Sequence, residues 1–150
     1  MHATTETSIE SRAILAGLVD ILAGLKRRAG DREDPATVFL LRHLTESPPR
    51  RVTELAECSR LDVSTVSRHM KSLEEAGHVV RIEDPHDGRA SRLSITEQGQ
   101  ALYDTAMAAR SAALDRGLVG WTDEDRRALV ELITRLATNL NPANETRSSR

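Results

Sequence analysis

The sequence of 150 residues has a single cysteine, Cys58, so it can form no internal disulfide and holds no cysteine cluster for zinc. Aromatic residues are almost absent, with one Phe, one Tyr and one Trp, and the core must therefore be built from Leu, Val, Ile and Ala. That composition favours helices over sheets. No apolar run approaches the ~18 residues of a membrane span, and the first ten residues lack the basic and then apolar pattern of a signal peptide. We therefore expect a cytoplasmic protein without membrane contact.

Motifs of catalysis and of metal binding are also missing. The chain has no glycine loop of the kind that holds phosphate and no Gly-x-Ser-x-Gly. None of the five histidines forms the His-x3-His pair that a metal site on a helix favours. We therefore expect no enzymatic activity, no cofactor and no metal site.

Excess charge of one sign is absent too, since the formal net charge is −2. Between Arg42 and Arg92, nine basic residues face nine acidic ones, so a surface for nucleic acid would require charges sorted onto one face. Of the 21 basic residues, 19 are Arg. The planar guanidinium suits phosphates and guanine edges, although a genome rich in Arg codons would give the same bias.

Apolar residues recur at helical spacing through residues 8–29, after seven residues that we expect to be disordered. Residues 30–35 break this helix. A stripe of this length favours an interface with a partner, and packing within the same subunit is the alternative. A second helix begins at Pro35 and ends at residues 47–49.

The central stretch predicts a helix-turn-helix unit. A short helix over residues 52–59 and a turn at 59–61 lead to a helix over residues 62–76, for which Asp62 is the expected N-cap. Its apolar stripe and its outer polar face separate cleanly. The stripe consists of Val63, Val66, Met70 and Leu73, and the outer face of Ser64, Thr65, Ser67, Arg68, Lys71 and Ser72.

A hairpin follows this helix. Gly77 is expected to end the helix in the left-handed conformation. Val80 and Ile82 fall on one face of a strand over residues 79–83, and Leu93 and Ile95 alternate in the next strand. Residues 85–88 carry turn chemistry, with Arg89 at the tip. The pattern predicts a recognition helix followed by a wing.

Two helices are expected after the wing. Thr96 caps the first, over residues 97–118, and Thr122 with Asp125 forms a capping box for the second, which ends near Leu140. Residues 141–150 are polar and expected to be loose. The fold class is therefore mainly α with a small β-hairpin wing: a winged helix-turn-helix flanked by helices.

Three segments of this region resemble the MarR (multiple-antibiotic-resistance regulator) family. They are ELAE at 54–57, LDVSTVSRHMKSLEEAGHVVR at 61–81 and DPHDGRASRLSITEQG at 84–99. The Asp-Pro-x-Asp-x-Arg wing followed by Leu-x-Ile-Thr-x-x-Gly is the most specific of these. The likeness is close over residues 50–99, and the order of the flanking helices agrees over nearly the whole chain.

The resemblance implies a homodimeric, sequence-specific transcriptional regulator of double-stranded DNA, most simply a repressor on a pseudo-palindromic operator. Residues 8–34 and 97–140 would form the dimer base, and residues 35–96 the DNA-binding domain. Arg89 would enter the minor groove with Asp87 orienting it. Ser64, Thr65, Ser67, Arg68 and Lys71 would face the major groove, with His69 at its flank.

The resemblance also implies release from DNA by a small effector, often an aromatic acid or a phenol. Arg42 and His43 are candidate partners for such an anion, and an exposed helix face is the alternative for both. The alternatives for this chain are a redox- or metal-responsive sensor on the same scaffold and an architectural DNA-binding protein that needs no ligand. For Cys58 we expect a small buried hydrophobe rather than a redox thiol.

Several arginines have competing roles. Arg68 could contact a base or pair with Glu74 or Glu75, although six or seven residues is poor spacing for an ion pair on a helix. Arg81 or Arg92 could pair with Glu83 or Asp84. Arg50 and Arg51 could touch phosphates or keep a loop soluble.

Overall fold

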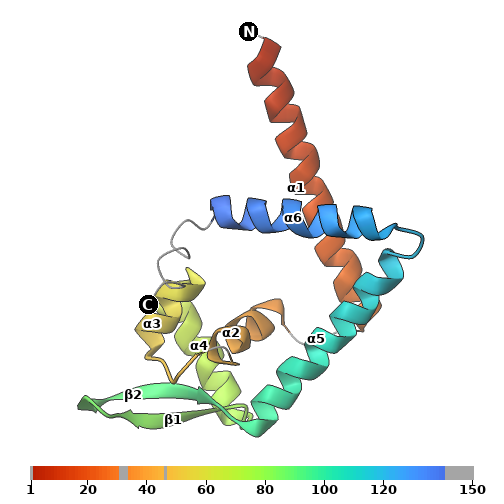
Figure 1. Cartoon of the computed structure of the whole chain (residues 1–150). Coiled ribbons are helices and arrows are strands. Elements are labelled where there is room, and N and C mark those ends of the chain that lie inside the picture. Colours follow the sequence, from red (N-terminus) through yellow and green to blue (C-terminus); the bar gives the residue numbers. More distant parts are fainter. Residues whose placement is uncertain (1, 31–33, 46, 141–150) are drawn as a thin grey trace. The chain divides into compact units, whose positions relative to one another are not determined.

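A computed structural model describes residues 2–30, 34–45 and 47–140 of the chain. The described residues form two compact units, which divide between residues 113 and 114. The described part contains six helices and one antiparallel hairpin, and Figure 1 labels these elements. In chain order the elements are α1 (His2–Ala29), α2 (Pro35–Thr45), α3 (Val52–Ser59), α4 (Val63–Glu75), β1 (Val79–Asp84), β2 (Asp87–Ile95), α5 (Glu97–Gly117) and α6 (Asp123–Leu140). The predicted fold class is confirmed.

The first helix is longer than its apolar pattern suggested. It begins at His2, so the expectation of disorder for residues 2–7 is wrong. Those residues carry no apolar periodicity, which is why the pattern could not place them in a helix. The helix ends before Gly30, whose φ of 61° is a conformation that favours glycine. The predicted loose tail, residues 141–150, lies outside the described residues.

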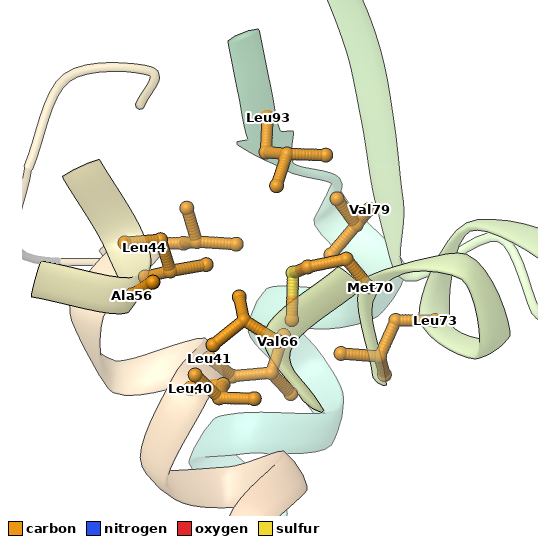
Figure 2. Packing of buried hydrophobic residues seen from close by; sticks show 10 residues of the cluster. Leu40, Leu41, Leu44, Ala56, Val66, Met70, Leu73, Val79 and Leu93 are labelled. Atoms are coloured by element: carbon orange, nitrogen blue, oxygen red, sulfur yellow. The ribbon is translucent and has the colours of Figure 1, made fainter. Parts of the chain in front are cut away.

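One hydrophobic core joins α2, α3, α4 and the hairpin. In Figure 2, side chains from these elements meet around Val66 and Met70 of α4, both of which are fully buried. The cluster consists of Leu40, Leu41, Leu44, Leu55, Ala56, Val66, Met70, Leu73, Val79 and Leu93. The expected inner stripe of α4 is thus confirmed for three of its four members. Val63 is 49% exposed, because it stands in the first turn of the helix, beyond the edge of the core.

The hairpin packs on this core by one face. Val79 pairs with Ile95 and Arg81 with Leu93, and paired residues project to the same side of a sheet. Val79 and Leu93 are buried. Val80 and Ile82 share a face, as expected, but it is the outer one, and they are 44% and 39% exposed.

The helix ends follow local rules that the sequence made visible. Gly77 has a φ of 78° and follows the last turn of α4, with its N–H donating to the carbonyl of Glu74. Thr96 Oγ1 accepts the N–H of Gly99 at 3.1 Å and so caps α5. At the start of α6, Thr122 and Asp125 exchange both bonds of a capping box. These three predictions are confirmed.

Among the described residues, no helix is both long enough and apolar enough to cross a membrane.

Candidate DNA-binding surface

The turn between α3 and α4 sets the angle at which α4 is presented. Arg60 in this turn adopts a φ of 55°, the left-handed conformation, and Leu61 N–H donates to the carbonyl of Ala56 at 3.2 Å. Leu61 packs against the core from the end of the turn. Inner residues of α4 are thereby fixed in the core, and the opposite face of the helix is left for solvent.

Asp62 begins α4 through its backbone only. Its carbonyl accepts the N–H of Val66 at 3.0 Å, but its side chain makes no capping hydrogen bond. The predicted carboxylate cap is therefore wrong. Asp62 is exposed, and water that solvates its carboxylate competes with the amides of the first turn.

The outer face of α4 carries the predicted polar residues. Ser64, Arg68 and Lys71 are exposed, and Thr65 and Ser67 are half-buried beside them. A shallow depression of about 240 Å³ lies on this face, lined by Thr65, Arg68, His69 and Ser72. The surface offers hydroxyl and guanidinium donors on a single helix, and the major groove of DNA is wide enough to admit one helix.

Ion pairs near this face leave Arg68 available. Glu74 pairs with Arg81 at 2.9 Å, and Glu75 lies 3.9 Å from Lys71. Within the part of the chain that the structure describes, no ion pair to Arg68 forms, so the alternative of a bridge to Glu74 or Glu75 is wrong. The acidic residues that could have neutralised Arg68 are engaged elsewhere. His69 Nδ1 lies 3.9 Å from Asp34 Oδ2, at the flank of the helix.

Asp87 and Arg89 come together near the tip of the wing. Asp87 Oδ1 accepts the backbone N–H of Arg89 at 3.1 Å, which orients the backbone and leaves the guanidinium in solvent. The second oxygen of Asp87 lies 3.8 Å from Arg51 Nη2. Arg89 is exposed.

Asp84, at the end of β1, is the most heavily bonded side chain of the wing. Its carboxylate accepts Arg51 Nε at 2.6 Å, Arg92 Nε at 2.9 Å and the His86 N–H at 2.9 Å. The residue is 3% exposed. These bonds, first that from Arg51 and then that from the His86 amide, hold the pKa of Asp84 well below its ordinary value of 3.8.

The arginines that flank the wing are therefore structural. The proposed pairing of Arg92 with Asp84 is confirmed, and Arg81 pairs with Glu74 instead of Glu83 or Asp84. Arg51 fastens the wing to the start of α3, a role that neither alternative for this residue included. Arg50 forms a backbone bridge with Leu93, and its Nη2 donates to Ser47 Oγ at 2.6 Å.

Sequence reasoning included the pair of Asp84 with Arg92 but missed the pair of Asp84 with Arg51. A local signal existed, since an aspartate placed before a proline turn commonly accepts a backbone N–H two residues on, as it does from His86. The partner Arg51 lies 33 residues away, and no local pattern points to it.

The remaining candidates lie apart from this surface. Arg42 is exposed in the last turn of α2, and the ring of His43 meets Phe39 edge-on at 4.8 Å. Cys58 packs against the core, and its Sγ donates to the carbonyl of Leu55 at 3.3 Å. In the described ranges no three His, Cys, Asp or Glu residues gather as a metal site would need.

A helix-turn-helix packed on a hairpin, with donors on the second helix and an arginine near the hairpin tip, defines the winged helix-turn-helix class. The chain belongs to the MarR family of transcriptional regulators, whose profile matches residues 34–90. It is 36% identical over 111 residues to the HTH-type transcriptional regulator YxaD of Bacillus subtilis, an alignment that covers 74% of this chain and 77% of that protein.

Two further relatives carry more specific names. The HTH-type transcriptional repressor MdtR of Bacillus subtilis is 28% identical over 103 residues, 69% of this chain and 66% of that protein. The structure of Sco3205, a MarR family regulator from Streptomyces coelicolor in complex with DNA, is similar with a TM-score of 0.70 and 26% identity. That likeness covers 93% of this chain and 91% of Sco3205.

Proposed function

We propose that the protein is a cytoplasmic, homodimeric repressor that binds a pseudo-palindromic operator in double-stranded DNA and is released by a small effector. Each subunit would place the outer face of α4 in the major groove and Arg89 of the wing in the adjacent minor groove. A narrow minor groove concentrates negative potential and attracts arginine.

The observation that carries this proposal is that Arg68 and Arg89 are exposed while the nearby acidic residues pair with other groups. Neighbouring arginines such as Arg51 and Arg92 are held in ion pairs inside the wing. Some arginines are thus neutralised by ion pairs while others stay exposed. A chain with a net charge of −2 can therefore still present positive charge to DNA. The similar structure of Sco3205 is a complex with DNA, which supports DNA as the partner.

Apolar faces on the flanking helices support the homodimer. None of the residues of α6 is buried, and in α1 none of residues 9–29 is. Six large apolar side chains of α1 are each at least 50% exposed: Ile9, Ile14, Leu15, Val19, Ile21 and Leu22. A helix that shows this much apolar surface is stabilised by covering it. A second copy of the chain is the partner that we propose, with α1, α5 and α6 as the dimer base.

Release would follow from a change in the distance between the two α4 helices. Successive major grooves lie about 34–36 Å apart on one face of DNA. An effector that prefers a dimer with a different spacing of the α4 helices would therefore weaken DNA binding. The size of the effect is set by the difference between the effector's affinities for the two forms of the dimer. We propose an aromatic acid or phenol as the effector. Arg42 and His43 would serve as its anion partners, since a guanidinium pairs well with a carboxylate.

DNA binding by the purified protein tests the proposal. Fluorescence anisotropy would compare a duplex of the promoter of its own gene with a random duplex of equal length, at physiological and raised salt. Tight binding to the promoter alone supports a repressor, and equal binding to both duplexes with a steep salt slope indicates an architectural protein instead. Light scattering would show two chains per particle, and a monomer would contradict the dimer.

Two further experiments test how DNA binding is controlled. Titration with benzoate or phenol should release the promoter duplex, and Arg42→Ala should raise the concentration required. Release by peroxide or by a metal salt, but not by these compounds, would favour a sensor on the same scaffold. If release by peroxide persists in Cys58→Ser, the thiol is excluded as the sensor.

A further inference from the structure

A buried carboxylate joins the wing to the rest of the DNA-binding unit. The side chain of Asp84 has no exposed surface, and it is shared between Arg51 from the start of α3 and Arg92 from β2. Arg92 also donates to the carbonyl of Pro49 at 3.2 Å. One carboxylate therefore fastens both strands of the wing to the segment that leads into the support helix.

The same network reaches the wing arginine. Arg51 lies between the carboxylates of Asp84, at 2.6 Å, and Asp87, at 3.8 Å. Asp87 in turn accepts the backbone N–H of Arg89 at 3.1 Å. The carboxylates of Asp84 and Asp87 balance the guanidiniums of Arg51 and Arg92, so the network has no net charge. Its effect on the wing is therefore to fix the positions of these side chains.

A device of this kind is needed at the outer half of the wing, because the core holds only its base, through Val79 and Leu93. A two-stranded hairpin is marginally stable alone, and from residue 85 to residue 89 every side chain is exposed. The strand register also shifts between Glu83 and Asp84, so regular pairing does not continue to the tip. Buried ion pairs add little net stability and are best understood as fixing one arrangement.

We propose that Asp84 is a positioning residue for DNA binding, which together with Arg51 holds the wing in one orientation and presents Arg89 already ordered. The inference rests on the proposed function, because it concerns how that function is carried out. A wing that is ordered before binding avoids the cost of ordering on DNA. Loss of the network therefore weakens the contribution of Arg89 and spares that of α4.

The sign of the effect separates this role from simple electrostatics. Asp84→Asn removes a negative charge, which by Coulomb attraction alone should strengthen binding to DNA. The positioning role gives the opposite result, a loss of roughly three- to tenfold in affinity. Glu57→Gln is the matched control, since Glu57 is an exposed carboxylate on α3, outside the proposed dimer base. It makes the same change in charge and should leave affinity unchanged or slightly raised.

A double-mutant cycle with Arg89→Ala tests whether Asp84 acts through the wing. On the promoter duplex, Asp84→Asn should cost roughly three- to tenfold in the wild-type background and less than about twofold when Arg89 is already Ala. An equal loss in both backgrounds would overturn the proposal and reduce Asp84 to a general stabilising group. Arg51→Lys keeps the charge but loses the bond from Nε, and it should behave as Asp84→Asn does. Arg51→Lys carries the test if Asp84→Asn does not fold.

A measurement without DNA keeps this inference separate from the proposed function. Hydrogen exchange of the amides of residues 84–92 should accelerate in Asp84→Asn and in Arg51→Lys, with no change in α4. Unchanged exchange in the wing of both variants would refute the positioning role even if the protein proves to bind its promoter. Accelerated exchange together with equal binding of wild type to promoter and random duplexes would refute the proposed function alone.

Discussion

Gly99, in the first turn of α5, gives the sharpest test of the packing between this helix and the wing. A Cβ at this position would lie 2.0 Å from the carbonyl oxygen of His78 and 2.9 Å from Ile95 Cγ1, whereas ordinary contacts begin near 3.4 Å. The carbonyl belongs to the backbone and cannot rotate away. Gly99→Ala must therefore separate α5 from the α4–β1 junction by more than an ångström.

The expected cost follows from the bonds that this separation would break. Thr96 donates its N–H to His78 at 3.1 Å and its hydroxyl to the carbonyl of Gly77 at 2.7 Å. Two such bonds contribute about 2 kcal/mol, and overpacking adds about 1–3 kcal/mol. The higher helix propensity of Ala offsets about 1 kcal/mol of this. We expect the free energy of unfolding to fall by about 2–4 kcal/mol.

Urea denaturation followed by circular dichroism, at one fixed protein concentration, would measure this change. Gly117→Ala is the matched control, because a Cβ there has no neighbour within 4 Å. In Gly117→Ala only the higher helix propensity of Ala matters, so the free energy of unfolding should rise by up to about 1 kcal/mol. If Gly99→Ala is as stable as the wild type, the close approach of α5 to His78 is wrong.

Three other predictions test the core, the wing and the recognition helix. Met70→Ala should lower the free energy of unfolding by about 2–5 kcal/mol in the same urea assay, because Met70 is fully buried at the centre of the core; a loss below 1 kcal/mol would contradict that packing. The folded-state pKa of Asp84 lies below its unfolded value of 3.8, so its stabilising effect is complete above about pH 4 and is lost as the pH falls further. The stability difference between wild type and Asp84→Asn should therefore be constant from pH 6 to 8 and shrink below about pH 4, and urea melts that show it changing near neutrality would refute this. Arg68→Ala should relax base preference within each half-site at a cost of about 1–3 kcal/mol, and an equal loss on random and promoter duplexes would make Arg68 a phosphate contact.

The parts of the fold that could be predicted are those set by neighbouring residues. The helical spacing of apolar residues located α2, α4 and α6, because one face of a helix must be covered. Gly77, Thr96 and Thr122 act on backbone groups within a few residues, so their roles were visible in the sequence.

The features that the sequence left open, or that we predicted wrongly, depend on distant parts of the chain or on solvent. Whether Val80 and Ile82 or their neighbours face the core depends on how the hairpin docks, and the alternation of residues is the same in either case. The ion pair of Asp84 with Arg51 spans 33 residues. Asp62 failed as a side-chain cap although its position is right, because an exposed carboxylate has water as a competing partner.

The candidate site was predictable as a face rather than as a set of contacts. Periodicity placed Ser64, Arg68 and Lys71 on the outside of α4, and the structure shows them there. It could not show that Glu74 and Glu75 would be engaged by Arg81 and Lys71. That engagement is what leaves Arg68 without an ion pair to Glu74 or Glu75 in the described structure.

A footprint on the promoter of the protein's own gene tests the central claim most directly. The proposal predicts two protected half-sites whose centres lie about 34–36 Å apart, with protection at the outer flanks lost in Arg89→Ala and the half-sites retained. Uniform weak protection, equal to that on random DNA and unchanged by Arg89→Ala, would contradict it.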